Sequence, residues 1–374
     1  MKIAFSLYKY FPYGGLQRDF LRIARACLAR GHEVHAFVLR WQGPMPDWLP
    51  VTVADCRALT NTGRYRRYTR WLQKRLAAEH FDLLVGFNKM PGLDVYYAAD
   101  PCYAYKASHL RGRYYRFSPR YRHFSRYERA VFDARADTEI LLISDRQKDL
   151  FRHYYHTPEH RLHLLPPGID PGRRAPSNAA SLRAGFRREF EIGEDEQLML
   201  MVGSGFRTKG LDRALKAMAA LPEDLGSRTR LFVVGQDNPA EFKILARSLG
   251  VANKVRFFAG RDDIPRFLIG ADLLVHPAYA ENTGTVLLEA VVAGLPVLVT
   301  DVCGYARYVR EAGAGELVPT PFDPDDFRRR LDTMLRADKH AWRENGLRYA
   351  QTADIYSLPE RAAELIERVG DRRL

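Results

Sequence analysis

Hydrophobic positions along the chain follow two alternating patterns. Short continuous apolar runs alternate with stretches in which apolar residues return every three or four positions. The first pattern predicts buried strands, and the second predicts amphipathic helices. A strand, the turn Gly14-Gly15, a helix that ends at Gly31 and a second strand form a βαβ unit, which favours a parallel sheet. In this half we expect strands at residues 2–8, 34–39, 81–87 and 139–143.

The alternation stops at Pro166-Pro167-Gly168 and begins again after residues 171–180, which are rich in proline, glycine and arginine. We therefore predict an α/β protein with two Rossmann-like doubly wound domains that face each other across a deep cleft. Ligands of such sheets bind beyond the carboxyl ends of the strands. The second set of strands is expected at 197–202, 230–234, 255–258, 273–276 and 296–299. The expected domains are residues 1–167 and 168–354, with a helix in 355–374 that returns to the first domain.

Composition narrows the class of protein. A chain of 374 residues is too long for one core, and 46% hydrophobic with 28% charged residues is typical of a globular protein. The net charge of +13 indicates an acidic partner, which is nucleic acid, anionic lipid or a phosphorylated substrate. Four scattered cysteines indicate free thiols in a cytoplasmic setting. No segment has the roughly 18 apolar residues of a spanning helix, and charges interrupt the first apolar run too early for an export signal.

The segment 281–289 carries the clearest chemistry. Glu281 and Glu289 bracket a glycine-containing turn and the first turn of an apolar helix, where free N–H groups favour phosphate or sugar oxygens. Glu289 lies within the otherwise apolar run 286–292, which we expect to be buried. A buried acid needs a hydrogen-bonding partner, such as a ribose diol. Two acids also suggest a glycosidase pair, but the adjacent turn favours a nucleotide sugar. The turn consists of Asn282, Thr283, Gly284 and Thr285.

Two further glycine turns follow predicted strands. Gly14-Gly15 is either a structural turn or a close approach of the backbone to a pyrophosphate, and the lack of a full G-x-G-x-x-G argues against a dehydrogenase. Asp19, one turn into the next helix, either faces the cleft or is a first-turn acid favoured by the helix dipole. Arg207 and Lys209, in the turn 203–210, can neutralise a departing diphosphate.

Together these motifs resemble the retaining GT-B glycosyltransferases of family four. The resemblance rests on Gly14-Gly15, the Lys209-Gly210 turn and the E-x7-E pair. Residues 7–19, 86–94 and 302–305 further resemble the lipopolysaccharide core glucosyltransferases. That resemblance implies transfer of glucose from UDP-glucose to heptose I of the inner-core glycolipid, with retention, an α-1,3 link, no cofactor and no metal.

The resemblance also implies roles for single residues. Glu281 would hold the glucose hydroxyls, Glu289 the ribose, and Lys209 with Arg207 the diphosphate. Family members carry an arginine where this chain has Ser204, and a histidine where it offers Asp100, which becomes a candidate to orient sugar or acceptor. The remaining donor-site candidates are Gly14, Gly15, Arg173, Gly203, Gly235, Gly260, Arg261 (through its main chain near the uracil), Asn282, Thr283, Gly284 and Thr285.

Residues 103–132 are basic and aromatic, with Glu128 as their one acid. This composition fits a solvated helix or a single-stranded nucleic-acid site, but a surface that docks on the anionic cytoplasmic face of the inner membrane suits a glycolipid acceptor better. A UDP-sugar epimerase of GT-B fold and a basic nucleic-acid-binding protein are the alternative functions, and the two glycine turns favour the transferase over both. In 323–326 the D-x-D pattern is interpreted as a helix N-cap rather than a metal site. The membrane candidates are Arg113, Tyr114, Tyr115, Arg116, Phe117, Arg120, Arg122 and Arg126.

Overall fold

The computed structural model describes residues 1–12, 14–109 and 111–373, with only the backbone of Arg113. The chain divides into two compact units. The first unit comprises Met1–Gly168 and Tyr356–Leu374, and the second comprises Ile169–Ile355. The domain limits expected from the sequence lie within one residue of these. Among the described helices, none is both long and apolar enough to cross a membrane.

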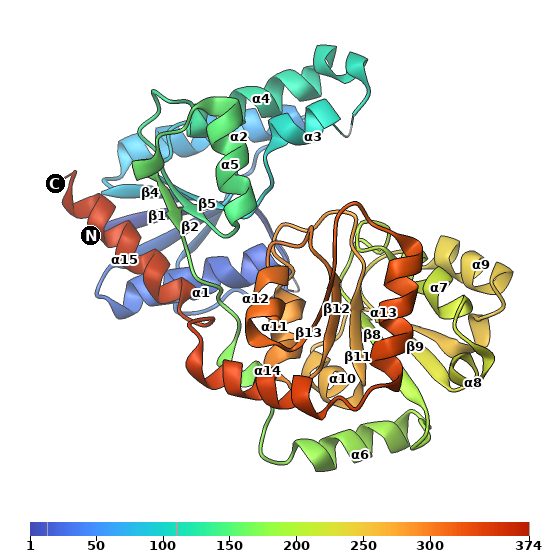
Figure 1. Cartoon of the computed structure of the whole chain (residues 1–374). Coiled ribbons are helices and arrows are strands. Elements are labelled where there is room, and N and C mark those ends of the chain that lie inside the picture. Colours follow the sequence, from blue (N-terminus) through green and yellow to red (C-terminus); the bar gives the residue numbers. More distant parts are fainter. Residues whose placement is uncertain (13, 110, 374) are drawn as a thin grey trace. The chain divides into compact units, whose positions relative to one another are not determined.

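The first unit is built on a parallel sheet of seven strands in the order β3-β2-β1-β4-β5-β6-β7 (Figure 1). Every neighbouring pair of strands runs in the same direction. All the strands therefore end at one edge of the sheet, where the loops that carry candidate residues also lie. The strands are β1 (Lys2–Tyr10), β2 (Glu33–Trp41), β3 (Val51–Val53), β4 (Leu83–Gly86), β5 (Val95–Ala98), β6 (Glu139–Leu142) and β7 (Leu162–Leu164).

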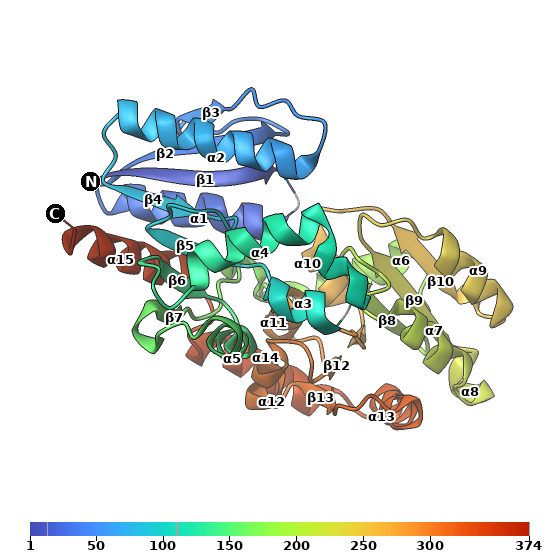
Figure 2. The ribbon, with the colours of Figure 1, turned by 90° about the horizontal axis from the view of Figure 1, so that it is seen from above.

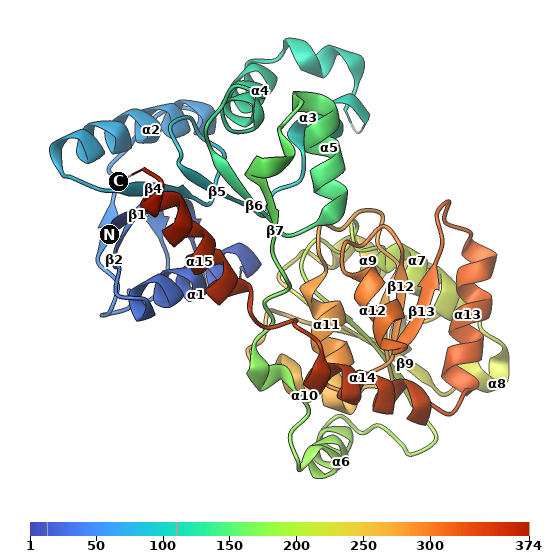
Figure 3. The same ribbon diagram turned by 60° about the vertical axis from the view of Figure 1, so that its left-hand side comes forward.

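Helices cover both faces of this sheet because alternate strand residues point to opposite sides. Ile3 and Phe5 pack with α1 and α15, whereas Ala4 and Phe37 pack with α2, α4 and α5. Figure 3 shows α15 lying along α1, although the two are far apart in the sequence. Figure 2 shows α2 and α4 over the same sheet. The helices are α1 (Gly15–Ala29), α2 (Asn61–Ala78), α3 (Tyr103–His109), η1 (Arg113–Phe117), α4 (Pro119–Phe132), α5 (Asp145–Tyr155), η2 (Glu159–Arg161) and α15 (Leu358–Asp371).

The second unit contains a parallel sheet of six strands in the order β10-β9-β8-β11-β12-β13. One face packs against α7, α9 and α13. The strands are β8 (Gln197–Val202), β9 (Thr229–Val234), β10 (Val255–Phe258), β11 (Leu273–His276), β12 (Val297–Thr300) and β13 (Gly315–Val318). The helices are η3 (Pro171–Arg173), α6 (Ala179–Glu189), α7 (Leu211–Ala219), α8 (Glu223–Gly226), α9 (Ala240–Ser248), η4 (Ala252–Lys254), α10 (Ile264–Gly270), α11 (Thr285–Val292), α12 (Ala306–Ala312), α13 (Pro324–Arg336) and α14 (His340–Thr352).

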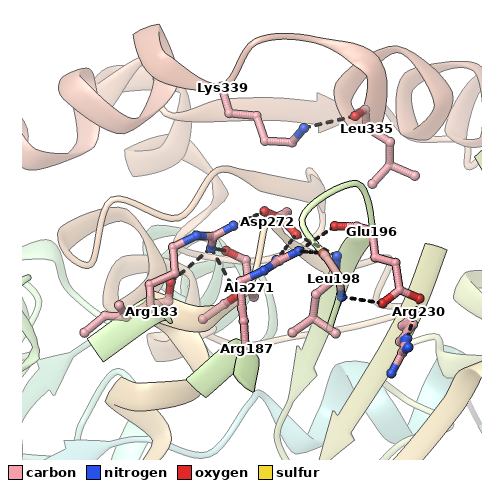
Figure 4. A network of polar contacts seen from close by, with 12 residues as sticks. Arg183, Arg187, Glu196, Leu198, Arg230, Ala271, Asp272, Leu335 and Lys339 are labelled. Atoms are coloured by element: carbon pink, nitrogen blue, oxygen red, sulfur yellow. Dashed lines mark hydrogen bonds and ion pairs between the residues drawn. The ribbon is translucent and has the colours of Figure 1, made fainter. Parts of the chain in front are cut away.

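A buried network centred on Asp272 fastens α6 to the second sheet (Figure 4). Asp272 pairs with Arg183 and with Arg187, whose Nη1 lies 3.0 Å from Oδ2. The backbone N–H of Leu198 on β8 donates to the same Oδ2 at 2.7 Å. Protein groups surround this carboxylate, so its role is to hold the elements together.

Local signals in the sequence are confirmed at two further points. Gly31, which was expected to end the first helix, has a φ of +83°, a backbone conformation that glycine adopts readily. The side chain of Asp323 accepts a hydrogen bond from the Asp325 N–H at the start of α13, as the N-cap interpretation requires. All four cysteines are free.

Candidate functional site

The turn between β11 and α11 is held by backbone contacts with residues 303–305. Gly284 has a φ of +85° and forms the N-cap of α11. The Tyr305 N–H donates to the Thr283 carbonyl at 2.8 Å, and Glu281 forms a parallel bridge with Cys303. These contacts place Asn282, Thr283, Gly284 and Thr285 at the start of an apolar helix, as the sequence predicts.

Lys209 and Glu281 form an ion pair, although 71 residues separate them in the sequence. Gly203 leaves room for the lysine, because a Cβ at this position would meet Lys209 Cε at 2.7 Å. Gly210 lets the loop approach residue 277, because a Cβ there would lie 2.0 Å from the Pro277 carbonyl oxygen. The glycines of the turn 203–210 therefore bring the lysine onto the carboxylate.

His276, the last residue of β11, is fully buried beneath this pair. Its Nε2 lies 3.5 Å from Glu281 Oε2. Burial alone would raise the pKa of Glu281, but the imidazole of His276 and the charge of Lys209 outweigh it and lower that pKa to about 2. Burial, with help from Lys209, lowers the pKa of His276. At neutral pH the site therefore holds an ionised carboxylate beside a neutral imidazole.

Sequence reasoning missed His276. The signal that was available is a polar residue at the carboxyl end of an otherwise apolar strand, and ligands gather at that end in doubly wound sheets. Among the described residues its Nδ1 has no hydrogen-bond partner, and its Nε2 approaches Glu281 Oε2 only to 3.5 Å, the limit of a hydrogen bond.

Glu289 lies on α11 and is 6% exposed. Its Oε1 is 3.7 Å from Nε of Arg173, at the end of η3. The structure therefore brings together two donor-site candidates that the sequence places 116 positions apart. The apolar run around Glu289 predicts that its buried carboxylate needs a partner. The guanidinium of Arg173 is such a partner.

Arg207 does not join the Lys209–Glu281 pair. Its side chain is 78% exposed and forms an ion pair with Glu241 on α9. The prediction that the two cations of this turn act side by side is thus not met in this conformation. The reason is geometric, because Lys209 turns inward beneath Gly203 while Arg207 extends into solvent.

The remaining candidates of the second unit lie in loops after β8, β9 and β10. Gly235 allows two of these loops to approach closely, since a Cβ there would lie 2.7 Å from the Gly203 carbonyl oxygen. Gly260 plays a similar part beside the side chain of Gln236. The guanidinium of Arg261 pairs with Asp263 at 2.6 Å.

In the first unit, Gly14 is the N-cap of α1 and Gly15 its first residue. Asp19 points toward β5, where its Oδ2 accepts a hydrogen bond from the Tyr97 hydroxyl at 2.8 Å. Burial raises the pKa of Asp19, although Arg18, Tyr97 and Arg22 oppose the change. Asp100 is exposed just after β5.

The basic segment forms α3, η1 and α4. Tyr114 and Phe117 are 72% and 77% exposed, whereas the hydroxyl of Tyr115 is bonded to that of Tyr103 at 2.8 Å. On α4, Tyr127 packs in the core. The side chain of Arg113 lies outside the described part of the chain. The other membrane candidates, Arg116, Arg120, Arg122 and Arg126, are exposed.

Comparison with known proteins decides the family. Residues 13–173 match the model of Glycosyltransferase Family 4, and residues 183–349 match that of Glycosyl transferases group 1. The chain is 46% identical over 368 residues to the lipopolysaccharide glucosyltransferase WaaG of Escherichia coli K12, covering 98% of each. The chain belongs to glycosyltransferase family 4.

Solved structures agree with this membership. The glycosyltransferase described here matches the crystal structure of WaaG with a TM-score of 0.92 over 97% of this chain and 99% of that one. It shares its fold with HepE of Anabaena, solved in complex with UDP and glucose, at a TM-score of 0.74 and 19% identity. The predicted GT-B class of two Rossmann-like domains is confirmed.

Proposed function

We propose that this glycosyltransferase moves glucose from UDP-glucose to heptose I of the lipopolysaccharide inner core, with retention and an α-1,3 linkage. The Lys209–Glu281 pair beside the turn 282–285 carries the proposal. It combines a cation, an ionised carboxylate and backbone donors at a helix N-terminus in one place. The identity to a lipopolysaccharide glucosyltransferase over 98% of the chain supports this choice of donor and acceptor.

In this proposal the diphosphate binds against Lys209 and the N–H groups of Thr283, Gly284 and Thr285. The bond between the anomeric carbon and the β-phosphate oxygen breaks, and negative charge grows on the leaving UDP. A lysine whose attraction strengthens with that charge lowers the barrier. Release from Glu281 frees the ammonium for the phosphate, and this lysine takes the part that a metal plays in other transferases. Transfer should therefore proceed unchanged with excess chelator.

The carboxylate of Glu281 then accepts hydrogen bonds from glucose hydroxyls. Its lowered pKa keeps it ionised at neutral pH. Glu289, oriented by Arg173, accepts from the ribose hydroxyls, and the main chain at Arg261 borders the uracil. Arg207 reaches the diphosphate only after it leaves Glu241.

The acceptor hydroxyl attacks on the face that the diphosphate leaves, which preserves the anomeric configuration. Its proton passes to the β-phosphate oxygen. His276 is neutral and fully buried, so we assign it to holding Glu281 rather than to proton transfer. Gly14, Gly15, Asp19 and Asp100, at the carboxyl ends of β1 and β5, are the candidates for orienting the reactants from the first unit.

We also propose that the basic aromatic segment docks the enzyme on the anionic cytoplasmic face of the inner membrane. Exposed arginines near such a surface contribute about 1 kcal/mol each, and exposed Tyr114 and Phe117 suit the interface. Vesicle flotation tests this point. Equal binding to neutral and anionic vesicles would contradict it.

The function is tested by offering UDP-glucose, UDP-galactose, UDP-GlcNAc and ADP-heptose with core lipopolysaccharide that ends at heptose. We expect product only with UDP-glucose, and its NMR spectrum should show an α-1,3 link. Incubation without acceptor separates the alternative of an epimerase, which would convert the UDP-sugar alone. A nucleic-acid-binding protein would ignore all four donors and would lose affinity steeply with salt.

A further inference from the structure

A pocket of about 800 Å³ lies in the first unit between α2 and α4, and arginines line both sides. Arg66 and Arg70 come from α2, and Arg122 and Arg126 come from α4. No carboxylate lines this pocket, and none of the four guanidinium groups has an ion-pair partner among the described residues. Like charges that converge without a counter-charge repel one another, so the arrangement favours an anion in the pocket.

A buried side chain points to the same conclusion. His123 lines the pocket, is only 8% exposed, and its Nε2 has no hydrogen-bond partner among the described residues. Burial, with the charges of Arg66 and Arg126, lowers the pKa of His123 to about 4. A buried polar atom without a partner costs free energy unless a ligand or water meets it. The neutral imidazole is therefore an additional hydrogen-bonding group for whatever the arginines hold.

The two helices present these groups by their periodicity. On α2, Thr62, Arg66, Arg70 and Gln73 recur every three or four residues and so share one face. On α4, Arg122 and Arg126 are one turn apart, and His123, the residue after Arg122, lines the same pocket. The pocket thus combines planar guanidinium donors with neutral polar groups, a combination that suits the tetrahedral oxygens of a phosphate.

We propose that this pocket binds the phosphate group of a mono- or diester, as carried by an anionic lipid or glycolipid. The pocket lies in the first unit, whereas Lys209, Glu281 and Glu289 of the donor site lie in the second. The two sites are therefore distinct. Two of its arginines belong to α2 and lie outside the segment 103–132. The proposal therefore goes beyond transfer from UDP-glucose and beyond general docking by that segment. Its failure would leave the donor site unaffected.

The test uses the full chain and the double variant Arg66→Gln/Arg70→Gln. The matched control is Arg64→Gln/Lys74→Gln, which removes two charges from exposed positions of the same helix that do not line the pocket. Binding of inorganic phosphate and pyrophosphate is measured by calorimetry without sugar nucleotide. Flotation is measured with phosphatidylcholine vesicles that contain phosphatidic acid or none. Circular dichroism verifies that each variant folds.

We expect the pocket variant to lose about tenfold or more in affinity for phosphate or for phosphatidic acid vesicles, because each arginine makes charged hydrogen bonds. The control should lose less than threefold on the same ligand. An effect on free phosphate alone assigns the site to a soluble phosphate, and an effect on vesicles alone assigns it to a headgroup. Equal losses in the two variants, or none in either, would overturn the proposal.

A second readout does not depend on affinity. In the wild type, a bound phosphate should raise the pKa of His123 from about 4 toward its ordinary value, because an anion favours the imidazolium. NMR titration of labelled histidine, assigned with His123→Asn, measures the shift. No change at a phosphate concentration that saturates the calorimetric signal would place the anion elsewhere and refute the site.

Discussion

Two of the lysine–glutamate pairs among the described residues differ in how completely the protein surrounds them. Lys89 and Glu128 lie in the first unit, where Glu128 is fully buried. The N–H groups of Tyr103 and Ala104 donate to its two oxygens at 2.7 and 2.9 Å, and the Tyr155 hydroxyl donates at 2.5 Å. Protein groups donate to both oxygens of this carboxylate. These bonds connect α3, α4 and α5.

Lys209 and Glu281 instead retain 16% and 18% of their side-chain exposure. Within the described residues, only Lys209 and His276 approach the carboxylate with side-chain groups. One oxygen and the ammonium protons therefore remain available. The comparison teaches that a buried ion pair is structural when the protein satisfies it fully, and that unused hydrogen-bonding capacity marks the pair that receives a ligand.

Removing the carboxylate of the structural pair should have the largest effect. Glu128→Ala removes the counter-charge of Lys89, whose ammonium keeps only the Pro101 carbonyl as an acceptor among the described residues. It also leaves the two N–H groups and the tyrosine hydroxyl without their acceptor in a buried place. We expect a loss of about 3–5 kcal/mol in the free energy of unfolding, measured by urea titration of circular dichroism. Glu281→Ala, as the matched change in the other pair, should cost less. A loss below about 1 kcal/mol for Glu128→Ala would remove the distinction between the pairs.

Removing the lysine of the second pair should affect rate more than stability. Lys209→Ala deletes a donor to the leaving diphosphate, which costs about 3–4 kcal/mol in the barrier, or about 100- to 1000-fold in kcat. Transfer of radiolabelled glucose measures the loss. Urea titration should show a smaller loss of stability than for Glu128→Ala, because Glu281 keeps His276 beside it and part of its exposure to water. Unchanged transfer would contradict the proposed role.

The low pKa of Glu281 predicts a specific dependence of stability on pH. Its folded pKa is about 2 against an ordinary value of 4.5, so the ionised carboxylate stabilises the fold fully above pH 4.5. That contribution should disappear as pH falls toward 2. The measurement is the difference in urea midpoint between wild type and Glu281→Gln from pH 7 to 3. A difference that stays constant over the whole range would mean that the pKa is not lowered.

Arg207, in the same turn as Lys209, provides an exposed cation for comparison. Its pair with Glu241 is exposed, and such pairs contribute about 0–1 kcal/mol. We expect Arg207→Ala to lower kcat by less than about tenfold, well below the effect of Lys209→Ala. Parallel assays of the two variants decide the point. Equal losses would show that Arg207 leaves Glu241 and shares the diphosphate charge.

The sequence predicts this fold well where local patterns decide the structure. Strands 197–202, 255–258 and 273–276 were placed at their observed limits. The first and the last are apolar runs that become inner, buried strands, whereas 255–258 is a strand at the edge of the sheet. Short edge strands such as β3 and β7 were missed, since three residues carry too little periodicity. The lengths of β1 and β2 were underestimated, because their polar ends extend beyond the apolar run.

The candidate site was predictable only in part. Glycine turns and the E-x7-E pair are local, so Glu281, Lys209 and Gly284 could be selected from the sequence. Which groups meet in space is not local. Glu128 looked like the one acid in a basic segment, and nothing near it in the chain predicts its bond to Lys89. For the same reason, the separation of Arg207 from Lys209 emerged only from the folded loop.

Hydrogen exchange measured by mass spectrometry, with and without UDP, tests the central claim most directly. If the Lys209–Glu281 site grips the leaving nucleotide, UDP should slow exchange in peptides that cover residues 203–210 and 281–289. Peptides around Glu128, whose two carboxylate oxygens already accept hydrogen bonds from the protein, should exchange at the same rate with and without UDP. Protection confined to other segments, with 281–289 unchanged, would contradict the account.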